Sequence, residues 1–260
     1  MIYTKKRLDF FISLGCRSSD HGLEYVPFTL PNDNEFNIEK AFKKAKNGEK
    51  VSQEENDIYK TMMLIFLAKM YARKNIVMQL HVSVLRNINT NQFIKIGANS
   101  GFDSVNDRCL CEALSCLLNY IEFDTEKSIT AVSNMPKTIL YSLNPKDYYS
   151  IATIMNGFQD SSCVGKMQLG SAWWFCDHKD GMEEQMRILA NLGMLPAFVG
   201  MITDSRSFLS YPRHEYFRRI LCNLIGKWVE NGEYSSDMEK LKNIVRDICF
   251  ENAKRYFEKI

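Results

Sequence analysis

Short apolar runs that alternate with helical patterns constrain the fold of this chain most strongly. Each run is bounded by turn residues and is apolar almost throughout, as expected of strands that are covered on both faces in a parallel sheet. Strands that alternate with helices favour βαβ units with right-handed crossovers. The predicted strands are Gly15–Ser19, Ile76–Val82, Lys137–Ser142, Lys166–Ser171 and Phe198–Thr203.

Helical periodicity follows these runs. The predicted helices are Ile58–Arg73, Asp107–Ile121, Pro145–Asn156, Met182–Leu192, Pro212–Asn231 and Asp237–Phe257. The polar segment Leu30–Asp57 breaks the rhythm, and we interpret it as a surface helical insertion after the first strand. An interaction arm is the alternative for that segment. Five β/α units are fewer than an eight-stranded barrel requires, so the pattern alone leaves an open parallel sheet and part of a barrel as alternatives.

Charge and cysteine content narrow the class of protein. A formal net charge of +2 gives no reason to expect a nucleic acid or an anionic membrane as partner. The chain has eight cysteines and no Cys-x-x-Cys pair, which favours free thiols in a reducing cytoplasm. Cys109, Cys111 and Cys116 are expected to be buried in a helix. The short run Leu8–Cys16 is too short for a membrane span and is better explained as a last helical turn capped by Gly15.

Polar side chains gather where the predicted strands end. In parallel β/α folds such positions meet at one edge of the sheet and carry the functional groups. The candidates lie at or just after the ends of the runs: Arg17, Asp20 and His21 for the first, His81 and Arg86 for the second, Trp173 for the fourth, and Asp204 and Arg206 for the fifth. They suit a small, anionic, hydroxylated substrate.

The chemistry of these residue types divides them into roles. Arg17, Arg86 and Arg206 offer forked donors to a carboxylate. Asp204 is a plausible oxygen ligand for a divalent metal. Asp20, His81 and Asp204 provide groups for acid–base work on a carbon-bound proton.

Each candidate also has a structural explanation. His21 beside Asp20 fits a loop pair, and His81 fits a core histidine equally well. Adjacent tryptophans such as Trp173 and Trp174 more often pack than bind a ligand. Asp204 could cap a helix, with Arg206 in a surface ion pair. The grouping at several strand ends, rather than any one residue, carries the prediction.

Several collinear motifs resemble those of uronate isomerases, and the resemblance spans essentially the whole chain. The motifs are Gly15–Gly22, Gln79–His81, Gly101–Ser104, Gly165–Phe175, Lys179–Glu183, Thr203–Arg219 and Asn252–Phe257. The resemblance implies interconversion of D-glucuronate with D-fructuronate and of D-galacturonate with D-tagaturonate. It also implies a (β/α)8 TIM barrel of the amidohydrolase superfamily, of which residues 1–260 would form the last five β/α units.

The family resemblance assigns roles by position. Asp204 looks like the metal-ligand aspartate of the last strand, and Arg206 like a substrate-binding arginine. His81 matches the histidine at a middle strand, and Asp20 matches the polar residue of the Ser-Asp-His loop. Trp173 matches the aromatic that lines the sugar pocket. The His-x-His ligands of the family lie on the first strand, so one divalent metal, zinc, would take its histidines from outside this chain.

The resemblance predicts a proton transfer between C2 and C1 through a cis-enediolate. We expect the chain to require the remaining barrel strands, in cis or from a separate chain, because isolated barrel strands expose unpaired edges. A homo-oligomer is compatible with the sequence. Two rivals remain, a hydrolase of the same superfamily and a non-catalytic remnant. A hydrolase would be expected to carry more histidines than the four present.

Overall fold

A four-stranded parallel sheet forms the centre of the computed structural model, which describes residues 2–31, 38–123, 134–201, 205 and 207–258. The strand order is β1-β2-β5-β6, and every neighbouring pair is parallel. The strands are β1 Ser18–Gly22, β2 Val77–Val82, β5 Thr138–Ser142 and β6 Met167–Leu169. The structure therefore confirms an α/β fold with a parallel sheet.

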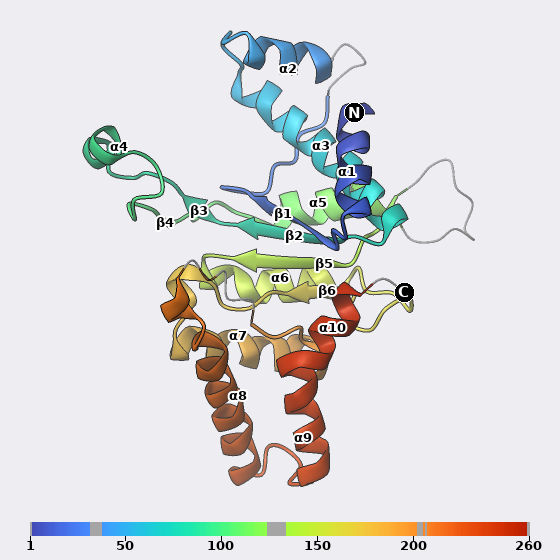
Figure 1. Cartoon of the computed structure of the whole chain (residues 1–260), viewed down its shortest axis with the longest axis vertical. Coiled ribbons are helices and arrows are strands. Elements are labelled where there is room, and N and C mark those ends of the chain that lie inside the picture. The colour runs from blue at the N-terminus through green and yellow to red at the C-terminus, as the bar shows by residue number, and fades with distance from the viewer. Residues whose placement is uncertain (1, 32–37, 124–133, 202–204, 206, 259–260) are drawn as a thin grey trace.

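Helices connect and cover the strands (Figure 1). They are α1 Ile2–Ser13, α2 Ile38–Lys46, α3 Gln53–Lys74, α5 Cys111–Glu122, α6 Tyr148–Asn156, α7 Lys179–Leu192, α8 Arg213–Glu230, α9 Met238–Arg246 and α10 Asn252–Phe257. Local signals in the sequence set their ends. The long helix α3 begins in a capping box between Ser52 and Glu55 and ends at Asn75, whose φ of 51° is left-handed. A π-helical turn, Asp247–Glu251, joins α9 to α10.

The register of the strands divides the sheet into two faces. Leu80, Leu140 and Leu169 are register neighbours, and each is at most 1% exposed, so this row points into the helical layer. The alternate positions point the other way: Asp20 pairs with Gln79, and His81 pairs with Tyr141. Asp20 is exposed, and Gln79 and His81 are half-buried. Asp20, Gln79 and His81 thus share the more open face.

Three expectations from the sequence need correction. The first strand begins at Ser18 rather than Gly15, because α1 ends just before Gly15, which adopts a φ of +94°. Residues 198–201 of the predicted fifth strand form no strand, since the side chain of Gln168 accepts from Val199 N at 3.1 Å in place of a neighbouring backbone. Residues 202–203 lie outside the described part of the chain. Cys109 and Cys111 are exposed rather than buried.

An arm that the sequence analysis did not predict leaves the sheet after β2. It consists of β3 Val84–Leu85, the short helix α4 Thr90–Ile96 and β4 Ser104–Val105. The strands β3 and β4 pair antiparallel, and Figure 1 shows the arm projecting away from the body of the molecule. Within the predicted insertion of residues 30–57, the described residues form α2 and the start of α3.

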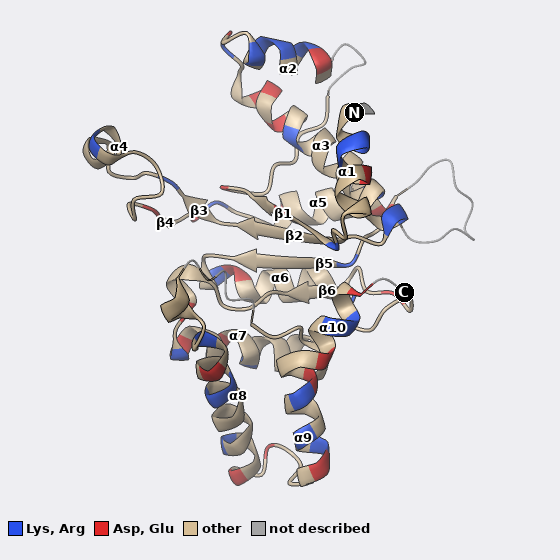
Figure 2. Cartoon of the chain, viewed as in Figure 1, with Lys and Arg blue, Asp and Glu red and all other residues tan. Residues whose placement is uncertain are grey.

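Charged residues of both signs are spread over the helices, and the strands carry few (Figure 2). This mixture agrees with the formal net charge of +2. None of the described helices combines the length and the apolar character that crossing a bilayer requires.

Candidate active site

Asp20 and His81 form the centre of the candidate site. They lie near the carboxyl ends of β1 and β2, on the more open face of the sheet, and the Nδ1 atom of His81 lies 2.7 Å from Asp20 Oδ1. The side chain of Asp20 is 61% exposed, whereas that of His81 is 19% exposed. Within the described part of the chain, Nε2 of His81 has no hydrogen-bond partner. None of the described residues therefore competes with a substrate for this nitrogen.

The pKa of the Asp20 carboxyl lies below its usual value. Partial burial is the largest single influence and acts to raise the pKa. It is outweighed by the hydrogen bond and the charge of His81, together with the charge and the backbone N–H of His21. Asp20 is therefore ionised at neutral pH and suited to orient the imidazole of His81.

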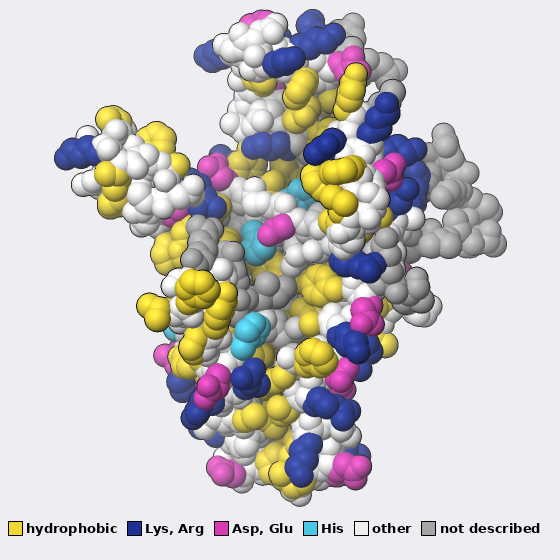
Figure 3. Space-filling view, viewed as in Figure 1, with side chains coloured by type: hydrophobic (Ala, Val, Ile, Leu, Met, Phe, Trp, Pro, Cys, Tyr) yellow, Lys and Arg dark blue, Asp and Glu magenta, His cyan; other side chains and the backbone are white. Residues whose placement is uncertain are grey.

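Aromatic rings enclose His81. The ring of Tyr141, from β5, stacks on the imidazole at 4.4 Å between centroids and 7° between planes. Trp173, in the segment after β6, lies 4.5 Å from His81 at 58°, and Trp174 lies 5.5 Å from Trp173. Trp174 has a left-handed φ of 51°, which costs a non-glycine residue on the order of 1–3 kcal/mol. Figure 3 shows histidine and acidic side chains adjoining on this side of the molecule.

Arg86 reaches the same cluster from the arm. Its guanidinium lies 5.0 Å from the centre of the Trp174 ring, and its Nη1 lies 3.0 Å from Asp103 Oδ2. The Asp103 side chain is 4% exposed, and its Oδ1 accepts from Asn87 N at 2.8 Å. Asp103 thus fixes one end of a guanidinium whose side chain is 36% exposed. The arm thus places the positive charge of Arg86 beside the ring of Trp174.

Arg17 and His21 are not brought into this cluster. Arg17 precedes β1, and its carbonyl accepts from the N–H of Val77, the first residue of β2. Val77 lies four positions before His81, which places the backbone of Arg17 about 13 Å away along the strand direction, at the opposite end of the sheet. Asp204 and Arg206 lie outside the described residues. His21 belongs to β1 rather than to a loop, and its Nε2 lies 3.2 Å from Tyr71 Oη on the helical side.

A metal centre is not assembled by the described residues, which contain no group of three or more histidine, cysteine, aspartate or glutamate side chains placed to hold an ion. Asp20 and His81 are only two donors, and their facing atoms are hydrogen-bonded to each other. A zinc site takes at least three protein ligands. The described part of the chain therefore does not fit a zinc ion by itself.

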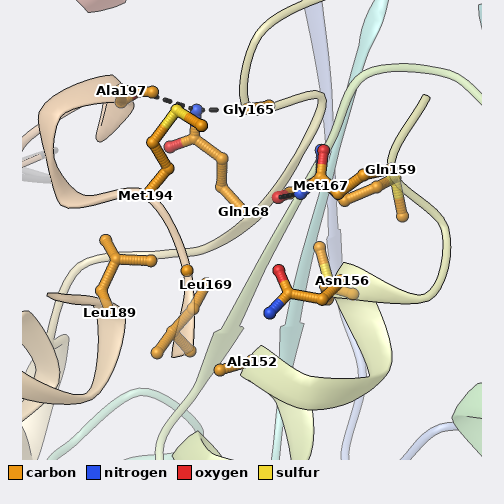
Figure 4. Close-up of a pocket in the computed structure, with 12 residues that line it drawn as sticks. Ala152, Asn156, Gln159, Gly165, Met167, Gln168, Leu169, Leu189, Met194 and Ala197 are labelled. Carbon is orange, nitrogen blue, oxygen red and sulfur yellow. Dashed lines mark hydrogen bonds between the residues drawn. The ribbon is translucent and has the colours of Figure 1, made fainter. Parts of the chain in front are cut away.

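A pocket at the other end of β6 is a poor candidate for an anion site (Figure 4). It lies between the ends of α6 and α7, and its described lining has no charged side chain. Gln168 closes it by donating to the carbonyls of Gly165 at 2.9 Å and Ala197 at 3.1 Å. Because Gln168 is used in these structural hydrogen bonds, we interpret the pocket as a gap in the packing and not as a binding site.

Sequence reasoning missed Tyr141, Gln79 and the Arg86–Asp103 pair. Tyr141 lies in an apolar run, and only the register with His81 shows that its ring belongs to the site. The run did offer a signal, because Tyr141 is the penultimate residue of β5. The Arg86–Asp103 pair depends on the arm, which folds residues 17 positions apart against each other.

Comparisons with known proteins agree with the geometry. The family model described as glucuronate isomerase matches residues 2–257. The uronate isomerase of Brachyspira hyodysenteriae is 55% identical over 251 residues, which are 96% of this chain and 52% of that protein. The uronate isomerase of Caldicellulosiruptor saccharolyticus is 53% identical over 253 residues, 97% of this chain and 52% of that protein.

Solved structures give the same result. The uronate isomerase of Thermotoga maritima superposes with a TM-score of 0.82 at 31% identity, covering 96% of this chain and 51% of that one. The glucuronate isomerase of Caulobacter crescentus gives 0.80 at 25% identity, covering 98% of this chain and 49% of that one. The chain spans about half the length of the relatives it matches. It belongs to the glucuronate isomerase family.

Proposed function

We propose that this chain provides one part of a uronate isomerase, which interconverts D-glucuronate with D-fructuronate and D-galacturonate with D-tagaturonate. The observation that carries the proposal is the Asp20–His81 pair, at 2.7 Å, beside Trp173. Arg86 lies over the adjoining Trp174 at 5.0 Å and supplies the positive charge that a sugar acid requires. The names of the relatives support the isomerase over a hydrolase or a non-catalytic remnant.

In the proposed reaction a proton leaves C2 of the open-chain aldose and returns to C1, through a cis-enediolate. The free Nε2 of His81 takes and returns protons, while Asp20 holds Nδ1 and stabilises the imidazolium that forms. Arg86 and Arg206 bind the substrate carboxylate, and Trp173 packs against the sugar. Asp204 moves a hydroxyl proton at the reacting end. The electron pair of the C2–H bond forms the C1=C2 double bond of the enediolate, and the carbonyl oxygen at C1 takes the charge. The hydroxyl proton that Asp204 moves passes from the oxygen at C2 to the oxygen at C1. The oxygen at C2 then becomes the ketone carbonyl as the double-bond pair takes up the proton at C1.

The proposal extends to the rest of the enzyme. The sheet would be part of a (β/α)8 barrel, of which residues 1–260 form the last five β/α units and residues 30–57 a helical insertion. The remaining strands would come from the same polypeptide or from a separate chain. One divalent metal, zinc, would be held by Asp204 and by histidines outside this chain, and no step above depends on it. The eight free cysteines suit the cytoplasm, and a homo-oligomer is compatible with the proposal.

The test is an assay of ketose formation from glucuronate and galacturonate. The chain would be assayed alone and together with the first half of a close relative, supplied as a fusion or a second polypeptide. We expect turnover only from the combination. In the active form Asp20→Asn should lower kcat about 10²-fold or more, because the imidazole loses its charged partner.

The matched control is Asp9→Asn, which removes an exposed carboxylate paired with Lys74 at 2.9 Å on α1 and α3. Arg206→Met should also abolish most activity. Full turnover by both the Asp20 and the Arg206 variants would overturn the proposed roles, and a combination that binds neither sugar acid would overturn the function.

A further inference from the structure

We infer that Tyr141 and Gly170 are positioning residues that fix the plane of the His81 imidazole. This inference rests on the proposed function of His81, and it adds two residues to the site. Neither belongs to the strand that carries His81: Tyr141 lies in β5, and Gly170 directly follows β6.

The stack between Tyr141 and His81 follows from strand register. The two residues are direct neighbours across β2 and β5, so their side chains project from the same face of the sheet. Their rings are 4.4 Å apart and within 7° of parallel. One hydrogen bond at Nδ1 still allows an imidazole to turn about its bond to Cβ. The flat contact with Tyr141 removes that freedom.

A hydrogen bond and burial fix the position of Tyr141. Its hydroxyl donates to Gln79 Oε1 at 3.0 Å, and Gln79 lies two residues before His81 on the same strand. The residue is 2% exposed, and this burial raises the pKa of the phenol well above its usual value, so the hydroxyl keeps its proton as a donor.

Gly170 provides the space that the tyrosine ring occupies. A Cβ atom built on Gly170 would lie 2.2 Å from Tyr141 Cδ1 and 2.4 Å from Cε1, far inside van der Waals contact. The backbone N–H of Gly170 donates to Leu140 O at 2.9 Å, which holds the two strands together at this point. The φ of Gly170 lies outside the left-handed region, so alanine is compatible with its backbone. The three atoms nearest to such a Cβ all belong to the ring of Tyr141.

Together these contacts leave one direction for the free nitrogen. Asp20 holds Nδ1, Tyr141 covers one face of the imidazole, and Trp173 packs at 4.5 Å with a tilt of 58°. Nε2 then points to a fixed place over the sheet. A general base acts only when it is held within hydrogen-bond reach of the proton it removes.

The test uses the histidine NMR spectrum of the 260-residue chain, which has only four imidazoles. His81→Gln identifies the signal of His81. Tyr141→Leu and Gly170→Ala should both shift the ring-proton signals of His81, because the stacked ring is lost or displaced. Tyr141→Phe keeps the ring and should leave them nearly in place. The matched control is Gly226→Ala, where a Cβ meets nothing within 4 Å.

A thermodynamic cycle keeps the inference testable if Gly170→Ala folds poorly. Gly170→Ala should destabilise the wild-type chain strongly and the Tyr141→Leu chain much less, because the clashing ring is gone. Equal destabilisation in both backgrounds, or an unmoved His81 signal in Tyr141→Leu, would overturn the positioning role.

Activity gives a separate readout in the assembled enzyme. Tyr141→Leu should lower kcat about tenfold or more with little change in KM, and Tyr141→Phe should restore most of it. If the assembled wild type shows no turnover, the proposed function fails while the NMR result still decides whether Tyr141 and Gly170 orient His81. If turnover is present but Tyr141→Leu leaves kcat unchanged, the positioning role fails alone.

Discussion

The buried carboxylate of Asp147 ties together the segments that follow β2 and β5. Its Oδ2 accepts from the hydroxyl of Ser83 at 2.6 Å and from that of Ser142 at 2.7 Å. Asp147 is 4% exposed, Ser83 5% and Ser142 1%. Ser83 lies two residues after His81 and has a left-handed φ of 65°, at the point where the chain turns into the arm that carries Arg86. We predict how much the hydrogen bond between Ser83 and Asp147 contributes to the free energy of unfolding.

The magnitude follows from the chemistry of that contact. A hydrogen bond to a charged group contributes about 1.5–3 kcal/mol, and a buried donor left without an acceptor costs about 1–3 kcal/mol. In Asp147→Ala the hydroxyl of Ser142 can turn to Asn144 O at 3.1 Å, whereas that of Ser83 has no second acceptor among the described residues. Asp147→Ala should therefore lower the free energy of unfolding by about 3 kcal/mol.

A double-mutant cycle with Ser83→Ala isolates the pair. Urea unfolding of the wild type, the two single variants and the double variant should give a coupling of about 1.5–3 kcal/mol. The control cycle joins Ser83→Ala to Asp237→Ala, which removes the N-cap of α9 at the far end of the molecule in Figure 1. That cycle should be additive within about 0.5 kcal/mol. A Ser83–Asp147 coupling no larger than the control value would refute the reasoning.

Two other variants test the packing and the titration of the chain. Gly200→Ala should cost about 2 kcal/mol or more in urea unfolding, because it adds left-handed strain at a φ of +77° to a Cβ only 2.3 Å from Ile248 O. Gly232→Ala, with a φ of +75° and nothing within 4 Å, should cost only the strain, and equal costs would contradict the packing. The pKa of His21 lies below 6.5 because burial outweighs the charge of Asp20. The unfolded chain therefore takes up this proton first, and stability should fall as the pH drops from above 6.5 through the lowered pKa. In His21→Gln the free energy of unfolding, measured by urea unfolding, should depend less on pH over this range. An unchanged pH dependence would show that His21 does not titrate this way.

The sequence predicted β2 and β5 well because both are buried and continuously apolar. It misplaced β1, because one face of Ser18–Gly22 is open and the strand consists mainly of polar residues. Arg17 consequently looked like part of a strand end, although it precedes the strand. Residues 198–201 have the composition of a buried strand and are buried, but Gln168, about thirty positions earlier, bonds to the backbone at Ala197 and Val199. Nothing local in the sequence indicates such a long-range side-chain contact.

The sequence likewise predicted part of the candidate site. Asp20 and His81 were chosen for their chemistry, and the structure brings them together at 2.7 Å. Trp173 was also placed in the site by position, and its ring contacts His81. Tyr141 required the register of two strands that are about 60 residues apart in the chain, and Gly170 required the register of a third. These pairings depend on the fold as a whole, so residue type alone does not reveal them.

We propose that a sugar acid binds where Asp20, His81, Trp173 and Arg86 meet. A crystal structure of the assembled protein with glucuronate bound tests it most directly. We expect C1 and C2 of the sugar beside Nε2 of His81, with the carboxylate in a salt bridge to Arg86 or Arg206. Glucuronate bound instead at the opposite end of the sheet, near Arg17 or in the pocket closed by Gln168, would contradict it.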